Sequence, residues 1–134
     1  MARVQLALNV AHLDAAIEFY SKLFSIAPAK VRPGYANFVV ADPPLKLVLM
    51  EGGEPGSLNH LGVEVESTGD VTAASRRAAS DGLATKEEMT TTCCFAVQDK
   101  VWVQGPDNAW EIYTVLDDAQ SETPVCETTE CGSA

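Results

Sequence analysis

The sequence predicts an α+β fold made of two copies of a strand–helix–three-strand (βαβββ) unit. The main observation is an internal repeat, in which residues 6–10 (LALNV) align with residues 61–65 (LGVEV) and residues 45–47 align with residues 110–112. A repeat of about 55–60 residues that occurs only twice is too long and too few for a solenoid. Two such units are instead expected to form curved sheets around one cleft.

The first copy begins with the alternating residues 4–10, which predict a strand. Asp14 then begins an amphipathic helix, and Pro28 ends that region. Residues 35–40 and 45–50 predict two more strands, separated by a turn at residues 42–44. The apolar side chains of the helix recur at helical spacing and are Leu13, Ile17, Tyr20 and Phe24.

The second copy repeats this order of elements. Residues 58–65 predict a strand, and either Asp70 or Thr72 is expected to cap a helix that runs to about Ser80. Residues 83–89 predict a short strand. The remaining elements are strands at residues 95–97 and 100–103 around a turn at residues 98–99, and a last strand at residues 110–116.

The chain is therefore expected to form one domain over residues 1–116, with modules at residues 1–53 and 57–116 joined by a Gly-rich linker. Residues 117–134 are rich in Ser, Thr, Glu and Pro and predict a flexible acidic tail that contains two cysteines. A monomer and a homodimer are both compatible with paired modules, because the modules can pair within one chain or between two.

Composition narrows the classes of partner. The net charge of −10 argues against binding to nucleic acid or to an anionic membrane, whose phosphates would be repelled. The sequence holds no run of about 18 apolar residues and no basic–apolar start, so we expect neither a transmembrane helix nor a signal peptide. The expected location is the cytoplasm.

The repeat brings together three candidate metal ligands. His60 in the second copy aligns with Gln5 in the first, and Glu111 aligns with Lys46. A carboxylate in an otherwise apolar strand needs a partner, because burial of an unpaired charge is unfavourable. Gln5, His60 and Glu111 supply an amide, an imidazole and a carboxylate, a set that suits Fe(II), Mn(II) or Ni(II). A hydrogen-bonded core histidine and an outward-facing glutamate are the alternatives.

Cys93 and Cys94 form an adjacent thiol pair in the segment TTTCCF. In a regular strand they would point to opposite faces, so a shared site requires a turn or bulge at this position. Thiolates bind soft ions, and trivalent arsenic that carries one organic group has two bonds left for two thiols. The alternative is a pair of small buried residues. Cys126 and Cys131 in the tail are possible accessory thiols that would capture soft ions.

Five segments resemble one family: VQLALNV at residues 4–10, PGYANF at 33–38, ADPPLKLVL at 41–49, LNHLGVEV at 58–65 and TTCCFA at 91–96. They are similar to the ArsI carbon–arsenic lyases and the related CadI proteins of the vicinal oxygen chelate superfamily, whose glyoxalase-like fold is built from paired βαβββ modules. The resemblance covers roughly residues 1–116.

The resemblance implies an enzyme that uses Fe(II) and O₂ to cleave the carbon–arsenic bond of trivalent organoarsenicals. It implies that Gln5, His60 and Glu111 bind the metal, and that Cys93 and Cys94 bind the arsenical. Gln5 stands where superfamily dioxygenases usually have histidine. Four aromatic residues are candidates to line a pocket for an aryl group, although core packing would explain them equally well: Tyr35, Phe38, Phe95 and Trp102.

Two other functions remain open. The thiols could sequester cadmium or arsenic without turnover, as the likeness to CadI allows. The fold could also serve a glyoxalase or a fosfomycin-resistance enzyme, neither of which requires an adjacent cysteine pair.

Overall fold

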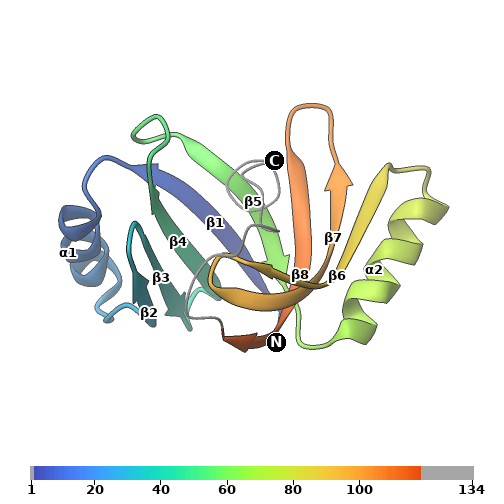
Figure 1. Cartoon of the computed structure of the whole chain (residues 1–134), viewed down its shortest axis with the longest axis horizontal. Coiled ribbons are helices and arrows are strands. Elements are labelled where there is room, and N and C mark those ends of the chain that lie inside the picture. The colour runs from blue at the N-terminus through green and yellow to red at the C-terminus, as the bar shows by residue number, and fades with distance from the viewer. Residues whose placement is uncertain (1, 119–134) are drawn as a thin grey trace. The chain divides into compact units, whose positions relative to one another are not determined.

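The computed structural model describes residues 2–118 and confirms two βαβββ modules (Figure 1). The chain divides into two compact units, one of residues 3–59 and one that contains Ala2 and residues from His60 onward. We call them the N-terminal and C-terminal units. Of the flexible tail predicted at residues 117–134, Asp117 and Asp118 belong instead to the last strand, because they pair with the neighbouring strand. Residues 119–134, with Cys126 and Cys131, lie outside the described residues.

The N-terminal unit contains a sheet with the strand order β2-β3-β4-β1, in which β1 and β4 are parallel. The short strand β2 is the one element that the sequence pattern does not predict. The elements are β1 (Arg3–Val10), α1 (Leu13–Phe24), β2 (Lys30–Arg32), β3 (Tyr35–Val40) and β4 (Leu45–Glu51).

The C-terminal unit repeats this topology, with the strand order β5-β8-β7-β6 and with β5 parallel to β8. Equivalent elements therefore follow each other in the same order in both units. The elements are β5 (Leu58–Glu64), α2 (Thr68–Ser80), β6 (Thr85–Cys93), β7 (Ala96–Gln104) and β8 (Ala109–Asp118).

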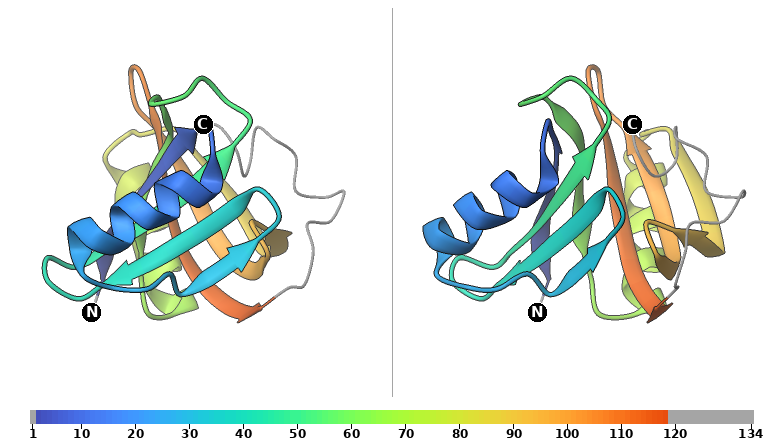
Figure 2. Two further views of the ribbon diagram at one scale, coloured as in Figure 1. Left: turned by 90° about the vertical axis from the view of Figure 1, so that its left-hand side faces the viewer. Right: turned by 60° about the vertical axis from the view of Figure 1, so that its left-hand side comes forward.

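Helix α1 lies across one face of its sheet (Figure 2). Its apolar side chains recur every three or four residues, so they form one stripe along the helix. That stripe packs on a buried cluster that includes Phe38, Leu47 and Leu49. The helix ends at Phe24, where Ser25 adopts the left-handed conformation with φ of 54°. Burial of the apolar stripe therefore positions the helix.

Helix α2 begins one turn earlier than the sequence indicates. Ser67, and not Asp70 or Thr72, is the N-cap, and its hydroxyl accepts a hydrogen bond from the backbone N–H of Asp70 at 3.1 Å. A serine that precedes the first helical turn satisfies one of the otherwise unpaired N–H groups. Four buried side chains at helical spacing face the sheet: Val71, Ala74, Ser75 and Ala78.

The hairpin of β6 and β7 corrects a second prediction. Gln98 and Asp99 do not form a turn but lie inside β7, and the turn falls at Cys94 and Phe95. The polar pair resembled a turn because it interrupts an apolar run. Asp99 is instead buried in β7. Its carboxylate accepts hydrogen bonds from the backbone N–H of Thr90 at 2.6 Å and from the Thr68 hydroxyl at 2.5 Å.

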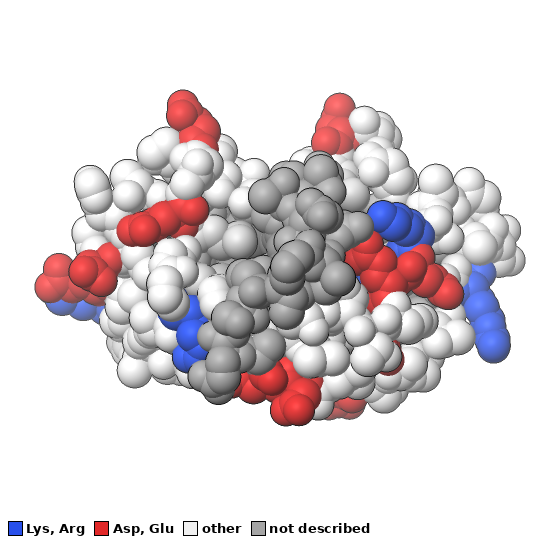
Figure 3. Space-filling model, in the orientation of Figure 1, with Lys and Arg blue, Asp and Glu red and all other residues white. Residues whose placement is uncertain are grey.

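Acidic side chains form several separate patches on the face seen in Figure 3, consistent with the net charge of −10. None of the helices in residues 2–118 is long and apolar enough to cross a membrane.

Candidate thiol and metal-ligand site

One face of the C-terminal sheet carries the candidate ligands. Trp102 in β7 lies opposite Glu111 in β8, and Lys100 precedes Trp102 by two residues. Glu111 also lies opposite Gly62 in β5, two residues after His60. Because side chains alternate between the faces of a strand, His60, Lys100, Trp102 and Glu111 share one face.

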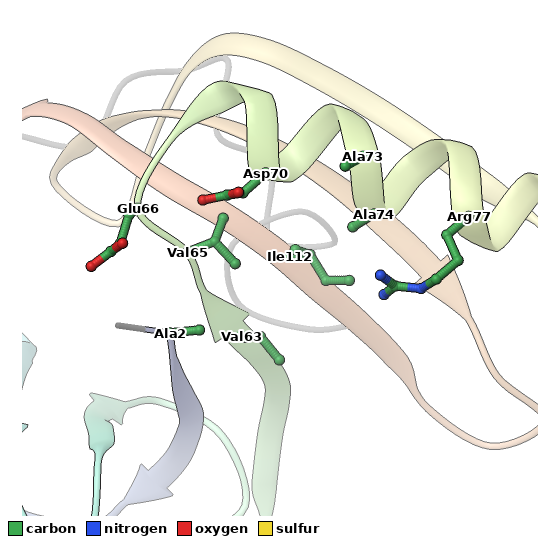
Figure 4. Close-up of a pocket in the computed structure, with 9 residues that line it drawn as sticks. All are labelled: Ala2, Val63, Val65, Glu66, Asp70, Ala73, Ala74, Arg77 and Ile112. Atoms are coloured by element: carbon green, nitrogen blue, oxygen red, sulfur yellow. The ribbon is translucent and has the colours of Figure 1, made fainter.

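The other face of this sheet is apolar and packs against α2. Figure 4 shows Val63 and Ile112 on the side of the sheet that faces the helix, around a pocket of about 370 Å³. None of the candidate metal ligands, cysteines or aromatic pocket residues lines this pocket. One face of the sheet therefore packs against the helix, and the other face carries the polar candidate groups.

His60 and Glu111 lie next to each other, and each is only 3% exposed. The Nε2 atom of His60 is 3.2 Å from the Oε2 atom of Glu111. The edge of the His60 ring meets Trp102 at 5.9 Å between ring centroids. The sequence analysis pairs these two residues through the repeat, and the structure brings their side chains into direct contact.

Lys100 is fully buried and completes this cluster. Its ammonium donates a hydrogen bond to Oε1 of Glu111, and it lies 5.5 Å from the centroid of the Trp102 ring. Lys100 is not among the site residues that the sequence predicts, because the sequence pattern places residue 100 at the start of a short strand after a turn. The alternation of Gln98, Lys100 and Trp102 with Val101 and Val103 is the signal that would have placed its side chain.

The cluster is charged despite its burial. Burial alone would raise the pKa of Glu111, but the Lys100 ammonium and then the His60 hydrogen bond outweigh it and lower that pKa to about 2. Burial would lower the pKa of Lys100, but the Glu111 carboxylate and next the Cys94 sulfur outweigh it and raise that pKa. Lys100 thus interacts with the carboxylate of Glu111 and with Cys94.

The geometry of His60 and Glu111 fits two neighbouring ligands of one divalent ion. Two metal bonds of about 2.1 Å at a right angle place their donor atoms about 3 Å apart. The observed 3.2 Å between Nε2 and Oε2 is close to that separation. Within residues 2–118, no cluster of three or more His, Cys, Asp or Glu side chains is arranged to hold a metal.

The thiol pair leaves strand geometry, as a shared site requires. Cys93 is the last residue of β6 and pairs with Ala96, so Cys94 and Phe95 alone form the turn of the hairpin. Their φ values of 53° and 62° are both positive, which is the pattern of a type I′ turn. The two sulfur atoms are 3.7 Å apart. Alternation along β6 and β7 places Cys93 on the same face as Gln98 and Lys100.

The two cysteines differ in burial and oxidation state. Cys93 is 1% exposed and disulfide-bonded, whereas Cys94 is partly exposed and in the thiol form. Binding of an ion by both sulfurs requires Cys93 to be reduced, because a thiolate is the metal ligand.

The remaining candidates fall in different places. Gln5 is buried in β1 opposite Lys46, within the N-terminal unit, and its role as a ligand stays a prediction. Phe38 belongs to the core beside α1, and that packing accounts for its burial without a ligand. Tyr35 is buried on the other face of β3, where its hydroxyl accepts a hydrogen bond from Asn37 at 2.9 Å.

The two aromatic candidates of the C-terminal unit lie in different places, Trp102 in the cluster and Phe95 in the turn after Cys94. Trp102 contacts His60 and Lys100, and its indole N–H donates to Glu88 at 3.3 Å. Phe95 is the second residue of the thiol turn and is 8% exposed.

Comparison with known proteins identifies the family to which the chain belongs. Residues 3–112 match the family model of the Glyoxalase/Bleomycin resistance protein/Dioxygenase superfamily. The Cadmium-induced protein CadI of Mycobacterium tuberculosis (strain ATCC 25618 / H37Rv) is 62% identical over 123 residues, which cover 90% of this chain and 81% of that protein.

Two other relatives are named as trivalent organoarsenical cleaving enzymes. The protein from Thermomonospora curvata is 57% identical over 142 residues, covering 100% of this chain and 94% of the relative. The protein from Bacillus sp. (strain MD1) is 40% identical over 136 residues, covering 94% and 83%.

Solved structures share the fold at low sequence identity. The Mn(II)-bound glyoxalase from Novosphingobium aromaticivorans has a TM-score of 0.62 at 17% identity, over 92% of this chain and 43% of that one. The homoprotocatechuate 2,3-dioxygenase from Arthrobacter globiformis has a TM-score of 0.60 at 18% identity, over 90% and 38%.

Proposed function

Because the chain belongs to the Glyoxalase/Bleomycin resistance protein/Dioxygenase superfamily, we propose that it cleaves the carbon–arsenic bond of trivalent organoarsenicals with Fe(II) and O₂. Relatives at 57% and 40% identity carry the name of trivalent organoarsenical cleaving enzymes. For a methyl substrate the balanced reaction converts CH₃As(OH)₂ and O₂ into As(OH)₃ and formaldehyde, with no external electron donor.

The observation that carries this proposal is the separation of 3.7 Å between the sulfurs of Cys93 and Cys94. One arsenic atom that bears a single organic group exchanges its two hydroxyls for two thiols and releases two waters. Such an exchange holds the arsenical at a fixed point and converts the later reaction into an effectively unimolecular one. Cys93 and Cys94 therefore form the proposed binding site for the arsenical.

His60 and Glu111, with Gln5, are the proposed ligands of the iron. When bound, iron would supply activation of O₂. Lys100 holds Oε1 of Glu111 and leaves Oε2 directed at His60. The same ammonium interacts with Cys94. The buried ammonium of Lys100 therefore interacts both with the proposed metal ligand Glu111 and with the proposed arsenical-binding residue Cys94.

Arsenite release is the direct test. Reduced protein, with a reductant present because Cys93 takes part in a disulfide, is incubated with methylarsenous acid and Fe(II) in air. We expect equal amounts of arsenite and formaldehyde, and we expect neither when iron or O₂ is left out. Equal, slow arsenite formation under all conditions would exclude the proposed reaction.

A second function is favoured by the relative named as a cadmium-induced protein, at 62% identity. The thiol pair would then bind soft ions without turnover. This alternative predicts tight binding of Cd(II) or of an arsenical, a stoichiometric complex, and no formaldehyde in the same assay. The ratio of formaldehyde to protein distinguishes the two functions, because only turnover takes it above one.

A further inference from the structure

The hairpin that carries the thiol pair contains residues ill suited to its turn. A two-residue type I′ turn needs positive φ at both positions, which favours Asn-Gly or Gly-Gly. Cys94 and Phe95 occupy these positions here, at φ of 53° and 62°. A side chain in this conformation is unfavourable by about 1–2 kcal/mol per residue. Other contacts must therefore hold the turn in place.

Gln98 provides such a contact from the neighbouring strand. Its Nε2 donates a hydrogen bond of 2.8 Å to the backbone carbonyl oxygen of Cys93. That carbonyl immediately precedes the turn, so the bond fixes the direction in which the chain enters it. The side chain of Gln98 is 4% exposed, and the bond is fully buried. No water competes for it, which strengthens the constraint.

The other end of the Gln98 amide is an anomaly. Its Oε1 is buried and has no hydrogen-bond partner among the described residues. An unsatisfied buried acceptor is unfavourable by about 1–3 kcal/mol. A leucine of similar size would avoid this cost, but it would also lose the hydrogen bond to the Cys93 carbonyl. What glutamine adds is the hydrogen bond to Cys93.

We propose that Gln98 is the positioning residue of the thiol pair: by holding the Cys93 carbonyl it keeps both sulfurs directed at one arsenic atom. The inference rests on the proposed function, in which two thiols bind one arsenical. Gln98 acts on the second As–S bond, whose strength depends on how well the second thiol is placed once the first has reacted. It has no role in the reaction of either thiol alone.

The test measures binding and not turnover. Metal-free, reduced protein under nitrogen is titrated with phenylarsenous acid, with a small dithiol as competitor. We expect Gln98→Leu to weaken binding about tenfold, which corresponds to loss of one buried hydrogen bond. Gln98→Met is the second variant in case the first does not fold. Gln104→Leu is the matched control, because Gln104 is an exposed glutamine on the same strand, and its side-chain amide donates to the carbonyl of Gly105 at a distance from the thiol pair in sequence.

A double-mutant cycle separates positioning from a general structural effect. Cys126 and Cys131 are replaced by serine throughout the cycle, so that no tail thiol can bind arsenic. In the added Cys93→Ser background Cys94 is then the remaining thiol, no second bond forms, and Gln98→Leu should change the affinity less than twofold. Equal weakening in both backgrounds would overturn the proposal in favour of a structural role. An unchanged affinity with the intact pair would overturn it as well. Failure of the wild-type protein to bind the arsenical would instead reject the proposed function itself.

Discussion

The two units share one topology but place different residues at the same turn. In the N-terminal unit β2 and β3 are joined by Pro33 and Gly34, and only Gly34 has positive φ, at 71°. In the C-terminal unit β6 and β7 are joined by Cys94 and Phe95, and both have positive φ. Proline and glycine suit a tight turn, whereas cysteine and phenylalanine do not.

This difference shows where the fold departs from local preference. Strained backbone that its surroundings hold in place is typical of functional sites. The C-terminal unit also contains the buried ion pair of Lys100 and Glu111, with His60 next to Glu111. One copy of the repeat thus follows ordinary turn chemistry, and the other carries strain and buried charge at the proposed site.

The largest expected effect is loss of one thiol. Cys94→Ser should weaken binding of phenylarsenous acid at least a hundredfold, because the second bond to arsenic gains its strength from effective concentration. Calorimetric titration of the reduced protein measures this loss. Pro33→Ala in the equivalent turn should leave the affinity unchanged. A Cys94→Ser variant that binds as tightly as the wild type would show that the pair does not act together.

The next effect concerns the buried charges. Lys100→Met leaves the carboxylate of Glu111 buried without its ammonium partner, so we expect the unfolding free energy to fall by about 3 kcal/mol. Urea denaturation measures it. Lys86, whose side chain is 65% exposed, also faces a carboxylate. Lys86→Met should change the unfolding free energy by less than about 0.5 kcal/mol. A similar loss of unfolding free energy in both variants would contradict the claim that burial makes the Lys100–Glu111 pair important for stability.

The same pair predicts a pH dependence. Against the effect of burial, the pKa of Glu111 in the folded protein is lowered to about 2 from its ordinary value of 4.5, chiefly by the Lys100 ammonium. Its ionised form therefore stabilises the fold above pH 4.5, and this contribution is lost as the pH falls from 4.5 toward 2. The difference in unfolding free energy between the wild type and Lys100→Met/Glu111→Leu should shrink over that range. A difference that is independent of pH would contradict the assigned ionisation.

The smallest effects concern the two turns. Gly34→Ala should destabilise the protein by about 1 kcal/mol, because alanine is strained at positive φ although no atom lies within 4 Å of its Cβ. Cys94→Gly should have the opposite effect and raise the unfolding free energy by up to about 1 kcal/mol, because glycine adopts positive φ without strain. The same substitution should abolish binding of the arsenical through two thiols. Thermal denaturation of the reduced variants checks both changes in stability. Stabilisation by both substitutions would remove the contrast between the turns.

Much of the fold follows from local patterns in the sequence. The repeat predicts two βαβββ modules, because strands with alternating apolar residues and helices with a 3.6-residue period recur in one order. The three residues of β2 are too few to show alternation. The turn at Cys94 and Phe95 escaped prediction because it contains no glycine, asparagine or aspartate, and Gln98 and Asp99 suggested a turn in its place.

The candidate site divides in the same way. His60 and Glu111 are found from the repeat, and Cys93 and Cys94 from their adjacency. The positions of the Lys100 and Gln98 side chains depend on the register of β7. That register is not apparent when the segment is interpreted as two short strands. A shift of a single residue in a strand moves every side chain to the other face. Residues that support a site from a neighbouring strand are therefore hard to recognise before the register is known.

The central claim is that the Cys93–Cys94 turn binds one arsenic atom through both sulfurs. X-ray absorption at the arsenic K-edge tests it directly, on reduced, metal-free Cys126→Ser/Cys131→Ser protein with one equivalent of phenylarsenous acid, because no tail thiol can then bind arsenic. We predict two sulfur neighbours and one carbon at each arsenic in this protein, and one sulfur, one oxygen and one carbon when Cys94→Ser is added. A spectrum with a single sulfur neighbour while Cys93 and Cys94 are both present would contradict the claim.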